Sequence, residues 1–318
     1  MDKNQNAKTI SDPATEPNDA LLTVKGLSVS FRMYTQRLTQ HDLKVISNLN
    51  ISISAGEIHA VAGSSGSGKS LLAHAILGIL PRNATVEGQI AYAGETLDER
   101  RLRHLRGREI ALVPQSVEYL DPLMRVGRQV SPDNAAVQKV FNRYQLDMTV
   151  ASMFPFQLSG GMMRRVLCAT AVVAGANLII ADEPTPGMSK DLAERAMRYF
   201  RDLADEGAAV MLITHDIDLA LNYADRISVF YAGTNLETAL VSDFQQEQAL
   251  RHPYTKALWR ALPRNGFQPT AGFQPSSNEL PAGCFFADRC ELRSDACLQG
   301  QIEPRYLRGG EVCCIHAL

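Results

Sequence analysis

A glycine-rich loop of eight residues constrains this chain more than any other feature of its sequence. It follows a short apolar strand expected at 57–62 and precedes a helical stretch at 70–80 that stops at Pro81. The loop matches the pattern G-x-x-x-x-G-K-S/T at every fixed position and consists of Gly63, Ser64, Ser65, Gly66, Ser67, Gly68, Lys69 and Ser70. A loop of this kind between a strand and a helix predicts a phosphate-binding loop in an α/β fold.

The chemistry of this loop follows from its residue types. Its glycines let the backbone wrap so that N–H groups face phosphate oxygens, and the N-terminus of the next helix adds positive potential. We expect Lys69 to bridge the β- and γ-phosphates and the Ser70 hydroxyl to take one position on Mg²⁺. A Gly/Ser turn that carries a lysine by chance is the alternative, but it does not explain the flanking strand and helix. The loop therefore predicts binding of ATP or GTP.

Two acidic residues follow a second apolar run directly. Residues 178–181 read Leu-Ile-Ile-Ala and precede Asp182 and Glu183. A strand buried on both faces delivers such carboxylates at its C-terminal edge, beside the phosphate loop. We expect Asp182 to hold Mg²⁺ through water and Glu183 to polarise attacking water as a general base. Alternatively, the pair caps the helix expected at 190–205.

Two further polar residues follow expected strands. His215 comes after a strand at 210–214, and Gln115 comes just after a strand at 110–113. A lone histidine is more often structural, but the position of His215 at a strand end favours contact with the γ-phosphate. Gln115 is expected to sense the same Mg²⁺ and the attacking water.

The order of apolar segments predicts an α/β architecture. Residues 21–53 alternate apolar and polar in the manner of strands, and the chain beyond 159 alternates short apolar strands with helices. Such alternation predicts a mainly parallel sheet covered on both faces. The polar, weakly helical stretch at 125–158 is interpreted as a separate lobe. Residues 1–20 are expected to be a flexible tail, and the Pro/Gly-rich run 263–283 a linker.

The charge balance excludes several function classes. Lys and Arg number 32 against 34 Asp and Glu, for a net charge of −2. This is too balanced for a protein that grips nucleic acid or an anionic membrane mainly by charge. No apolar run reaches the length of a spanning helix, and the polar N-terminus does not resemble a signal peptide, so we expect a soluble protein that is not secreted.

Five of the six cysteines crowd into the end of the chain. These are Cys284, Cys290, Cys297, Cys313 and Cys314. In a chain without an export signal, such crowding indicates a metal or cluster site more readily than disulfides. The sixth, Cys168, lies in an apolar stretch and is expected to be a small core residue.

A Ser-Gly-Gly turn narrows the choice among proteins that have such a phosphate loop. It opens a long helix expected at 159–174, with Ser159 as the N-cap and with Gly160 and Gly161 leaving the first amides bare as an anion site. Its place between Gln115 and the Asp182–Glu183 pair resembles the signature of the ABC superfamily. Five features occur over residues 63–215 in the same order as in that superfamily. They are the phosphate loop, the glutamine, the signature, the acid pair and the histidine.

The resemblance implies an ATPase domain at 21–250, with an antiparallel β subdomain and a helical signature subdomain at about 116–174. In ABC ATPases two such domains form a head-to-tail dimer, in which each signature caps the γ-phosphate held by the other subunit. An upstream aromatic residue stacks on adenine in the family. Phe31 fits best and Tyr34 is its rival, while core packing explains either residue equally simply.

Two features resemble the ATPase subunits of bacterial oligopeptide, dipeptide and nickel importers. One is the motif at 252–258, which reads His-Pro-Tyr-Thr-Lys-Ala-Leu, and the other is the cysteine-rich tail, so an extension is expected at 251–318. Some members hold a four-iron four-sulfur cluster with tail cysteines. By that resemblance the ligands here are Cys284, Cys290, Cys297 and Cys314, with zinc or plain thiols as alternatives.

The resemblance also implies partners. We expect a second, related ATPase subunit, two transmembrane permease subunits and an extracytoplasmic substrate-binding protein, with this chain peripheral on the cytoplasmic face of the inner membrane and no nucleic acid. Ser189 stands where the family has an aspartate that reaches the partner's phosphate loop, so we expect a heterodimer with two unequal sites. Rival interpretations are a nickel or metal-chelate importer, a non-transport ABC ATPase and a subunit that binds nucleotide without hydrolysing it.

Overall fold

The computed structural model describes residues 20–34 and 40–318. The tail expected at 1–20 lies outside the described residues except for Ala20, which begins the first strand. The strands are β1 (Ala20–Tyr34), β2 (Gln40–Ser54), β3 (Ile58–Gly63), β4 (Ala84–Tyr92), β5 (Glu95–Thr96), β6 (Ile110–Val113), β7 (Leu178–Asp182), β8 (Ala209–Thr214), β9 (Arg226–Tyr231), β10 (Thr234–Leu240), β11 (Arg305–Leu307) and β12 (Gly310–Val312). The helices are α1 (Lys69–Ile76), α2 (Glu99–Leu105), α3 (Val126–Val130), α4 (Asn134–Arg143), α5 (Gly160–Val172), α6 (Lys190–Asp205), α7 (Ile217–Tyr223) and α8 (Pro253–Arg260).

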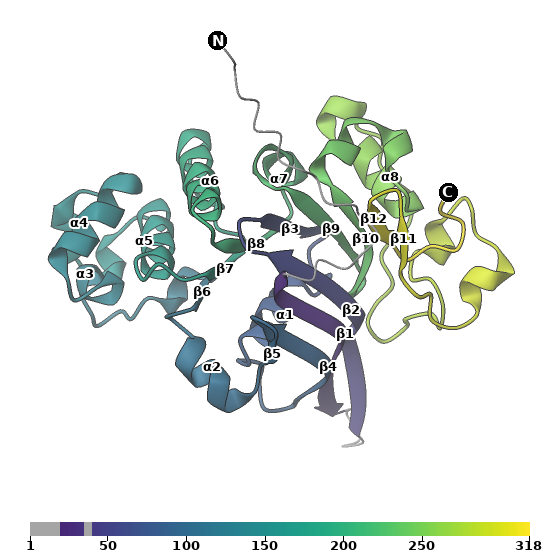
Figure 1. Ribbon diagram of the computed structural model, residues 1–318, viewed down its shortest axis with the longest axis horizontal. Helices are drawn as coiled ribbons and strands as arrows, with labels where there is room; N and C mark the ends of the chain where they lie inside the picture. Colours follow the sequence, from purple (N-terminus) through teal and green to yellow (C-terminus); the bar gives the residue numbers. More distant parts are fainter. Residues whose placement is uncertain (1–19, 35–39) are drawn as a thin grey trace, which may run out of the picture.

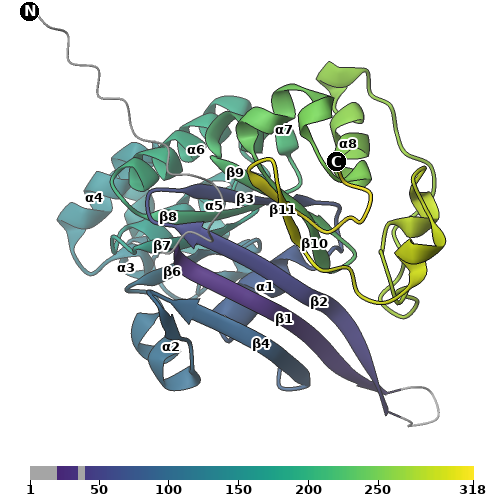
Figure 2. The same cartoon turned by 45° about the vertical axis from the view of Figure 1, so that its right-hand side comes forward.

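The larger sheet is parallel at its centre, as predicted. Its order is β11-β12-β10-β9-β3-β8-β7-β6, and the five strands from β9 to β6 run parallel to one another. Strands β3, β7 and β8 are buried along their whole length, which explains their largely apolar sequences. The remaining three strands are antiparallel and were not predicted. Two of them, β11 and β12, come from the end of the chain and pair onto β10 (Figure 2).

Both faces of this sheet are covered. Along β7, Leu178 and Ile180 face one core with α1 and the smaller sheet, whereas Ile179 and Ala181 face another core with α5 and α6. The smaller sheet is antiparallel, in the order β2-β1-β4-β5, and its long strands lie side by side beneath the larger sheet (Figure 1, Figure 2). The predicted antiparallel β subdomain is therefore present.

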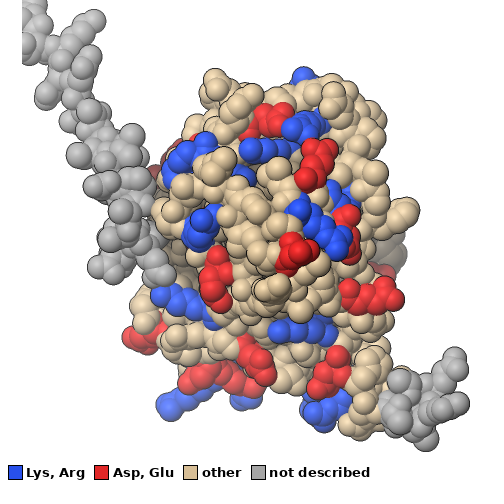
Figure 3. All heavy atoms as spheres, turned by 90° about the vertical axis from the view of Figure 1, so that its right-hand side faces the viewer, with Lys and Arg blue, Asp and Glu red and all other residues tan. Residues whose placement is uncertain are grey.

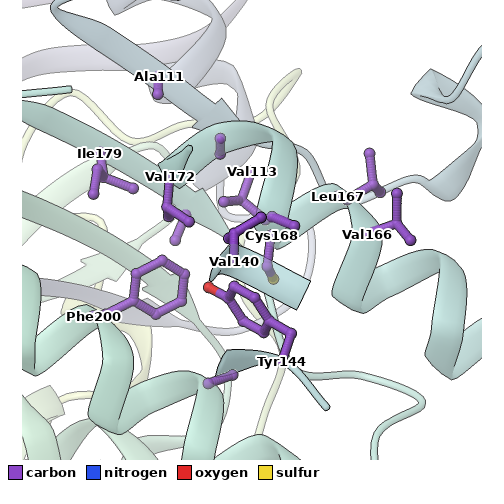
Figure 4. Packing of buried hydrophobic residues seen from close by; sticks show 14 of the residues in the cluster. Ala111, Val113, Val140, Tyr144, Val166, Leu167, Cys168, Val172, Ile179 and Phe200 are labelled. Atoms are coloured by element: carbon purple, nitrogen blue, oxygen red, sulfur yellow. The ribbon is translucent and has the colours of Figure 1, made fainter. Parts of the chain in front are cut away.

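The polar stretch before the Ser-Gly-Gly turn forms a helical lobe at one end of the molecule. Helices α3, α4 and α5 lie together there (Figure 1). Cys168 on α5 is fully buried beside Val140 of α4 and Tyr144, which directly follows α4, and this confirms its expected place in the core (Figure 4). The close packing of these side chains fixes α5, and with it the Ser-Gly-Gly turn, against the rest of the sheet.

Helix α1 is shorter than expected from the sequence. The apolar spacing continues to Leu80, but the helix ends at Ile76, because Gly78 adopts a left-handed conformation with φ of 59°. Pro81 therefore lies beyond the helix end.

The last third of the chain packs at the opposite end from the helical lobe (Figure 1). Seen from that side, positive and negative side chains are interspersed over the surface, in agreement with the balanced composition (Figure 3). Within residues 20–34 and 40–318, no helix combines the length and the apolar character that crossing a bilayer requires.

Candidate nucleotide site

The phosphate loop connects the C-terminal end of β3 to the start of α1. Gly63 passes so close to β9 that a Cβ there would lie 2.4 Å from the carbonyl oxygen of Phe230, so only glycine fits. Gly68 caps α1 with φ of 96°, a left-handed conformation that glycine adopts without strain. The two glycines therefore hold the loop against the sheet edge and aim the first turn of α1 at the space above it.

Lys69 folds back over this loop. Its Nζ donates hydrogen bonds of 2.8 Å to the carbonyl oxygens of Gly63 and Ser64. Burial lowers the pKa of Lys69, while the negative charges of Glu183 and Asp182 act in the opposite direction. The two residues of the predicted acid pair therefore lie close enough to Lys69 to interact with its charge.

Asp182 ends β7 and is buried. Burial raises the pKa of its carboxyl group against the effect of a hydrogen bond with Ser70. Its Oδ1 has no hydrogen-bond partner among the described residues although it is shielded from solvent. A buried carboxylate oxygen left unpaired beside a hydroxyl suits an oxygen-preferring cation, so Ser70 and Asp182 fit the predicted Mg²⁺ site.

Glu183 meets two of the other predicted residues. Its Oε1 lies 3.0 Å from Nδ1 of His215, and its Oε2 accepts a hydrogen bond of 3.4 Å from Nε2 of Gln115. Its backbone is left-handed, with φ of 45°, and is held by a 2.9 Å hydrogen bond from its N–H to the carbonyl of Ile213. Such strain in a non-glycine residue is typical of functional sites.

Glu183 and His215 border an open cavity of about 890 Å³. Its walls include Glu183, His215, the loop 185–188 and parts of α6 and α7. The sequence therefore identified three residues, Gln115, Glu183 and His215, that the fold brings together from the ends of three different strands.

The Ser-Gly-Gly turn is built as predicted. Ser159 caps α5, and its Oγ accepts a 3.3 Å hydrogen bond from the N–H of Met162. A Cβ on Gly161 would lie 3.0 Å from the carbonyl oxygen of Gly187, so the turn packs beside the loop that follows the acid pair. Gly160 is exposed. The role of this turn toward a partner's nucleotide stays a prediction.

The two candidate adenine-stacking residues differ in environment. Phe31 is half-buried and packs against the core between the two sheets, opposite Leu43 and Ala84 on neighbouring strands. Tyr34 exposes 63% of its surface, and its hydroxyl accepts a 2.9 Å hydrogen bond from Gln40. Which ring contacts adenine stays a prediction, with Phe31 as our expectation.

The tail cysteines are free thiols that lie near one another. Burial raises the pKa of Cys284 to about 11, and the thiols of Cys314, Cys290 and Cys297 add to this rise. Among the described residues, however, no three His, Cys, Asp or Glu side chains converge in a way that could hold a metal ion. The thiols therefore do not fit a single-ion site such as zinc, and the structure does not support the predicted cluster.

Two contacts to the phosphate loop were missed from the sequence. Ser64 donates a 2.8 Å hydrogen bond to Oε1 of Gln274, and its hydroxyl also lies close enough to the phenol of Tyr254 to lower the pKa of that phenol against the effect of burial. Tyr254 belongs to the motif at 252–258, which in the sequence analysis indicated only the family that the chain resembles. No local pattern connects Gln274 to a loop 210 residues away.

Comparisons with known proteins agree with this geometry. The ABC transporter family profile matches residues 46–186, and the profile named oligopeptide/dipeptide transporter, C-terminal region, matches 237–297. The chain is 32% identical over 306 residues to a probable peptide ABC transporter ATP-binding protein, y4tR, of Sinorhizobium fredii, which covers 88% of this chain and 89% of the relative. It is 32% identical over 308 residues to the oligopeptide transport ATP-binding protein OppD of Escherichia coli, which covers 89% of each.

Solved structures show the same fold. The ATP-binding cassette MJ0796, in a dimeric post-hydrolysis state bound to ADP and Pi, has a TM-score of 0.62 at 25% identity and covers 69% of this chain and 98% of that one. The dimeric structure of MJ0796 as a bacterial ABC transporter cassette gives 0.61 at 26% identity, with the same coverage. The chain is therefore an ATPase of the ABC transporter family and belongs to the branch that carries the oligopeptide/dipeptide transporter C-terminal region.

Proposed function

We propose that this ATPase drives a bacterial ABC importer for peptides. The observation that carries the proposal is the Gln115–Glu183–His215 constellation next to Lys69, in a chain that also has the oligopeptide/dipeptide C-terminal region. The relatives' names support the cargo class, since they include a probable D,D-dipeptide transport ATP-binding protein, DdpD, of Escherichia coli, 32% identical over 282 residues.

The residues of this constellation and of the neighbouring phosphate loop each have a role in ATP hydrolysis. Lys69 leaves the loop carbonyls for the β- and γ-phosphate oxygens, and the loop N–H groups support the same phosphates. Ser70, Asp182 and Gln115 hold Mg²⁺, which neutralises charge on the phosphates when bound. Glu183 accepts a proton from the attacking water, and His215 orients Glu183 and contacts the γ-phosphate.

The proposed assembly has two ATPase subunits beneath two permease subunits at the cytoplasmic face of the inner membrane. The dimeric MJ0796 cassette supports pairing of two such domains. In this pairing Ser159, Gly160 and Gly161 cap nucleotide held by the partner, and the lobe at 116–158 receives the permeases. An extracytoplasmic binding protein delivers the cargo.

The cargo assignment is tested in proteoliposomes. The assembled complex should hydrolyse ATP faster when the binding protein carries peptide, and it should accumulate labelled peptide only when ATP is present. If nickel or a metal chelate is accumulated instead and peptide is ignored, the peptide proposal is wrong, although the chain stays an importer ATPase.

We further propose that the partner ATPase is a different chain and that the two sites are unequal. Ser189 caps α6 without a side-chain hydrogen bond, at the position where the resemblance leads us to expect an aspartate. Glu183→Gln in this chain and the matching change in the partner should then reduce turnover of the complex by different factors. Equal reduction by both changes would contradict unequal sites.

The cluster hypothesis needs its own test. The thiols of Cys290, Cys297 and Cys314 raise the pKa of Cys284, and those of Cys290 and Cys297 raise the pKa of Cys314, which supports a shared neighbourhood only. Protein purified without oxygen should be brown and contain about four iron and four sulfide per chain if the hypothesis is correct. Colourless, iron-free protein would leave these residues as plain thiols.

A further inference from the structure

The C-terminal extension holds the phosphate loop from outside the nucleotide site. Ser64 Oγ donates a 2.8 Å hydrogen bond to Oε1 of Gln274, and the same hydroxyl lies close enough to the phenol of Tyr254 on α8 to lower the pKa of that phenol against the effect of burial. Two side chains of the extension thus converge on one residue of the loop.

Tyr254 is firmly placed. It is 6% exposed, and its ring centroid lies 4.5 Å from that of Tyr231 at the end of β9 and 5.3 Å from that of Phe286. Tyr231 and Phe286 also meet edge to face, with centroids 5.6 Å apart. This three-ring cluster restricts where the Tyr254 hydroxyl can point.

Gln274 is placed by a separate contact. Arg289 donates hydrogen bonds to the carbonyl oxygens of Ala271, at 2.9 Å, and Thr270, at 3.1 Å, a few residues before Gln274. Its guanidinium also lies over the rings of Tyr231 and Phe286 and donates a 3.2 Å hydrogen bond to the Tyr231 hydroxyl. Because Phe286 and Arg289 both lie between two tail cysteines in the sequence, one short segment supports both contacts to Ser64.

Ser64 in turn determines where the catalytic lysine rests. The Ser64 carbonyl oxygen accepts a 2.8 Å hydrogen bond from Lys69 Nζ. A shift of Ser64 would therefore move both an N–H group of the loop and the carbonyl oxygen that holds Lys69 Nζ. Nucleotide affinity depends on how well such a loop is preorganised for phosphate.

We propose that Tyr254 and Gln274 are positioning residues for the phosphate loop, which act through the Ser64 hydroxyl and set the affinity for ATP. This inference goes beyond the proposed function, because it holds for any cargo. It also gives the motif at 252–258 a task within the ATPase cycle.

The first test measures nucleotide affinity in the full chain. Binding of a non-hydrolysable ATP analogue with Mg²⁺ is followed by calorimetry for Tyr254→Phe and for Gln274→Ala. Each variant should raise Kd roughly three- to tenfold, the size of one lost hydrogen bond. Matched controls are Tyr92→Phe and Gln89→Ala, which lose side-chain hydrogen bonds to Glu109 and Thr96 and should keep the parental Kd.

The second test separates positioning from general stability. In a Ser64→Ala background the shared hydroxyl is gone, so Tyr254→Phe and Gln274→Ala should cause no further change in Kd. The proposal is overturned if both variants bind with parental affinity, or if their effects persist undiminished in that background. Should Tyr254→Phe fail to fold, Gln274→Ala decides alone, because Gln274 lies in a partly exposed segment.

Discussion

His215 Nδ1 lies 3.0 Å from Glu183 Oε1, and the two side chains reach this distance from the ends of two adjacent parallel strands. The register of β7 and β8 places Asp182 opposite Ile213, and Glu183 and His215 are the residues that directly follow the two strands. The N–H of Glu183 is bonded to the Ile213 carbonyl, which fixes the turn at this point. The strand register, rather than loop flexibility, therefore sets the distance between the proposed base and its partner.

The first prediction concerns the carboxylate of Glu183. Glu183→Gln keeps the shape of the side chain but removes its ability to accept a proton, so turnover of the assembled transporter should fall by about 10²- to 10⁴-fold while ATP binding persists. Initial rates of phosphate release and a separate binding measurement check this. The surface variant Glu99→Gln, which disturbs only an exposed pair with Arg103, should retain the parental rate. Normal turnover in Glu183→Gln would remove Glu183 from the proposed role.

The second prediction concerns Lys69. Lys69→Ala removes the only described side chain that caps the carbonyl oxygens of both Gly63 and Ser64, and it removes the positive charge intended for phosphate. ATP affinity should fall by at least tenfold, since charge-assisted hydrogen bonds contribute about 1.5–3 kcal/mol each. Calorimetry with ATP and Mg²⁺ measures the change, and Lys139→Ala on the exposed side of α4 is the control. Parental affinity in Lys69→Ala would contradict the assignment of the nucleotide site.

The strands that could be predicted are those whose environment is uniform along their length. β3, β7 and β8 are buried throughout, so their sequences are largely apolar and can be recognised without distant information. An exception is His59 of β3, whose Nε2 lies 2.8 Å from the Oγ of Ser228. β4 was missed because most of its residues are exposed and because Gly88 interrupts its apolar residues. β10 was missed for a different reason: it buries Asn235, Glu237 and Thr238, and the partner of the Glu237 carboxylate, Arg251, lies 14 residues further along the chain.

The residues of the site also differ in whether a local sequence pattern could predict them. Gln115, Glu183 and His215 each follow an apolar strand, so the rule that functional residues gather at the C-terminal edge of a parallel sheet was enough to group them. The contact of Gln274 with Ser64 depends on how a long irregular segment crosses the sheet edge. Such a path is determined by packing against Arg289, for which the sequence contains no periodic pattern.

The third prediction concerns a buried ion pair that joins β10 to the extension. Glu237 is fully buried and accepts hydrogen bonds from the N–H groups of Arg251 and His252 and from the Arg251 guanidinium, at 2.8–3.1 Å. Glu237→Gln removes the fully buried carboxylate and leaves Arg251 paired only with Asp243, at 2.9 Å, so it should lower the free energy of unfolding by about 1.5–3 kcal/mol. Urea unfolding of the full chain measures this loss. Glu95→Gln, which breaks the exposed pair with Arg101, should cost less than about 1 kcal/mol, and an equally small loss for Glu237→Gln would contradict the prediction.

The fourth prediction concerns the stability of the extension in acid. His252 is buried, and its Nδ1 accepts a 3.0 Å hydrogen bond from the N–H of Tyr254 at the start of α8. Its Nε2 is buried without a partner among the described residues, and burial lowers the pKa of the ring from 6.5 to about 3. Between these two values the unfolded chain binds a proton that the folded chain excludes, so stability falls as the pH falls through 6.5 and the loss levels off only near pH 3.

His252→Asn isolates this contribution, because asparagine keeps a side-chain acceptor for the helix cap but does not titrate. Between about pH 7 and pH 5 the parent should lose about 2 kcal/mol more unfolding free energy than the variant. Urea unfolding at the two pH values measures the difference, and His104→Asn on the exposed face of α2 should follow the parent. If the curves of parent and His252→Asn run parallel over this interval, the histidine is not held neutral by burial, and its cap on α8 must then tolerate protonation.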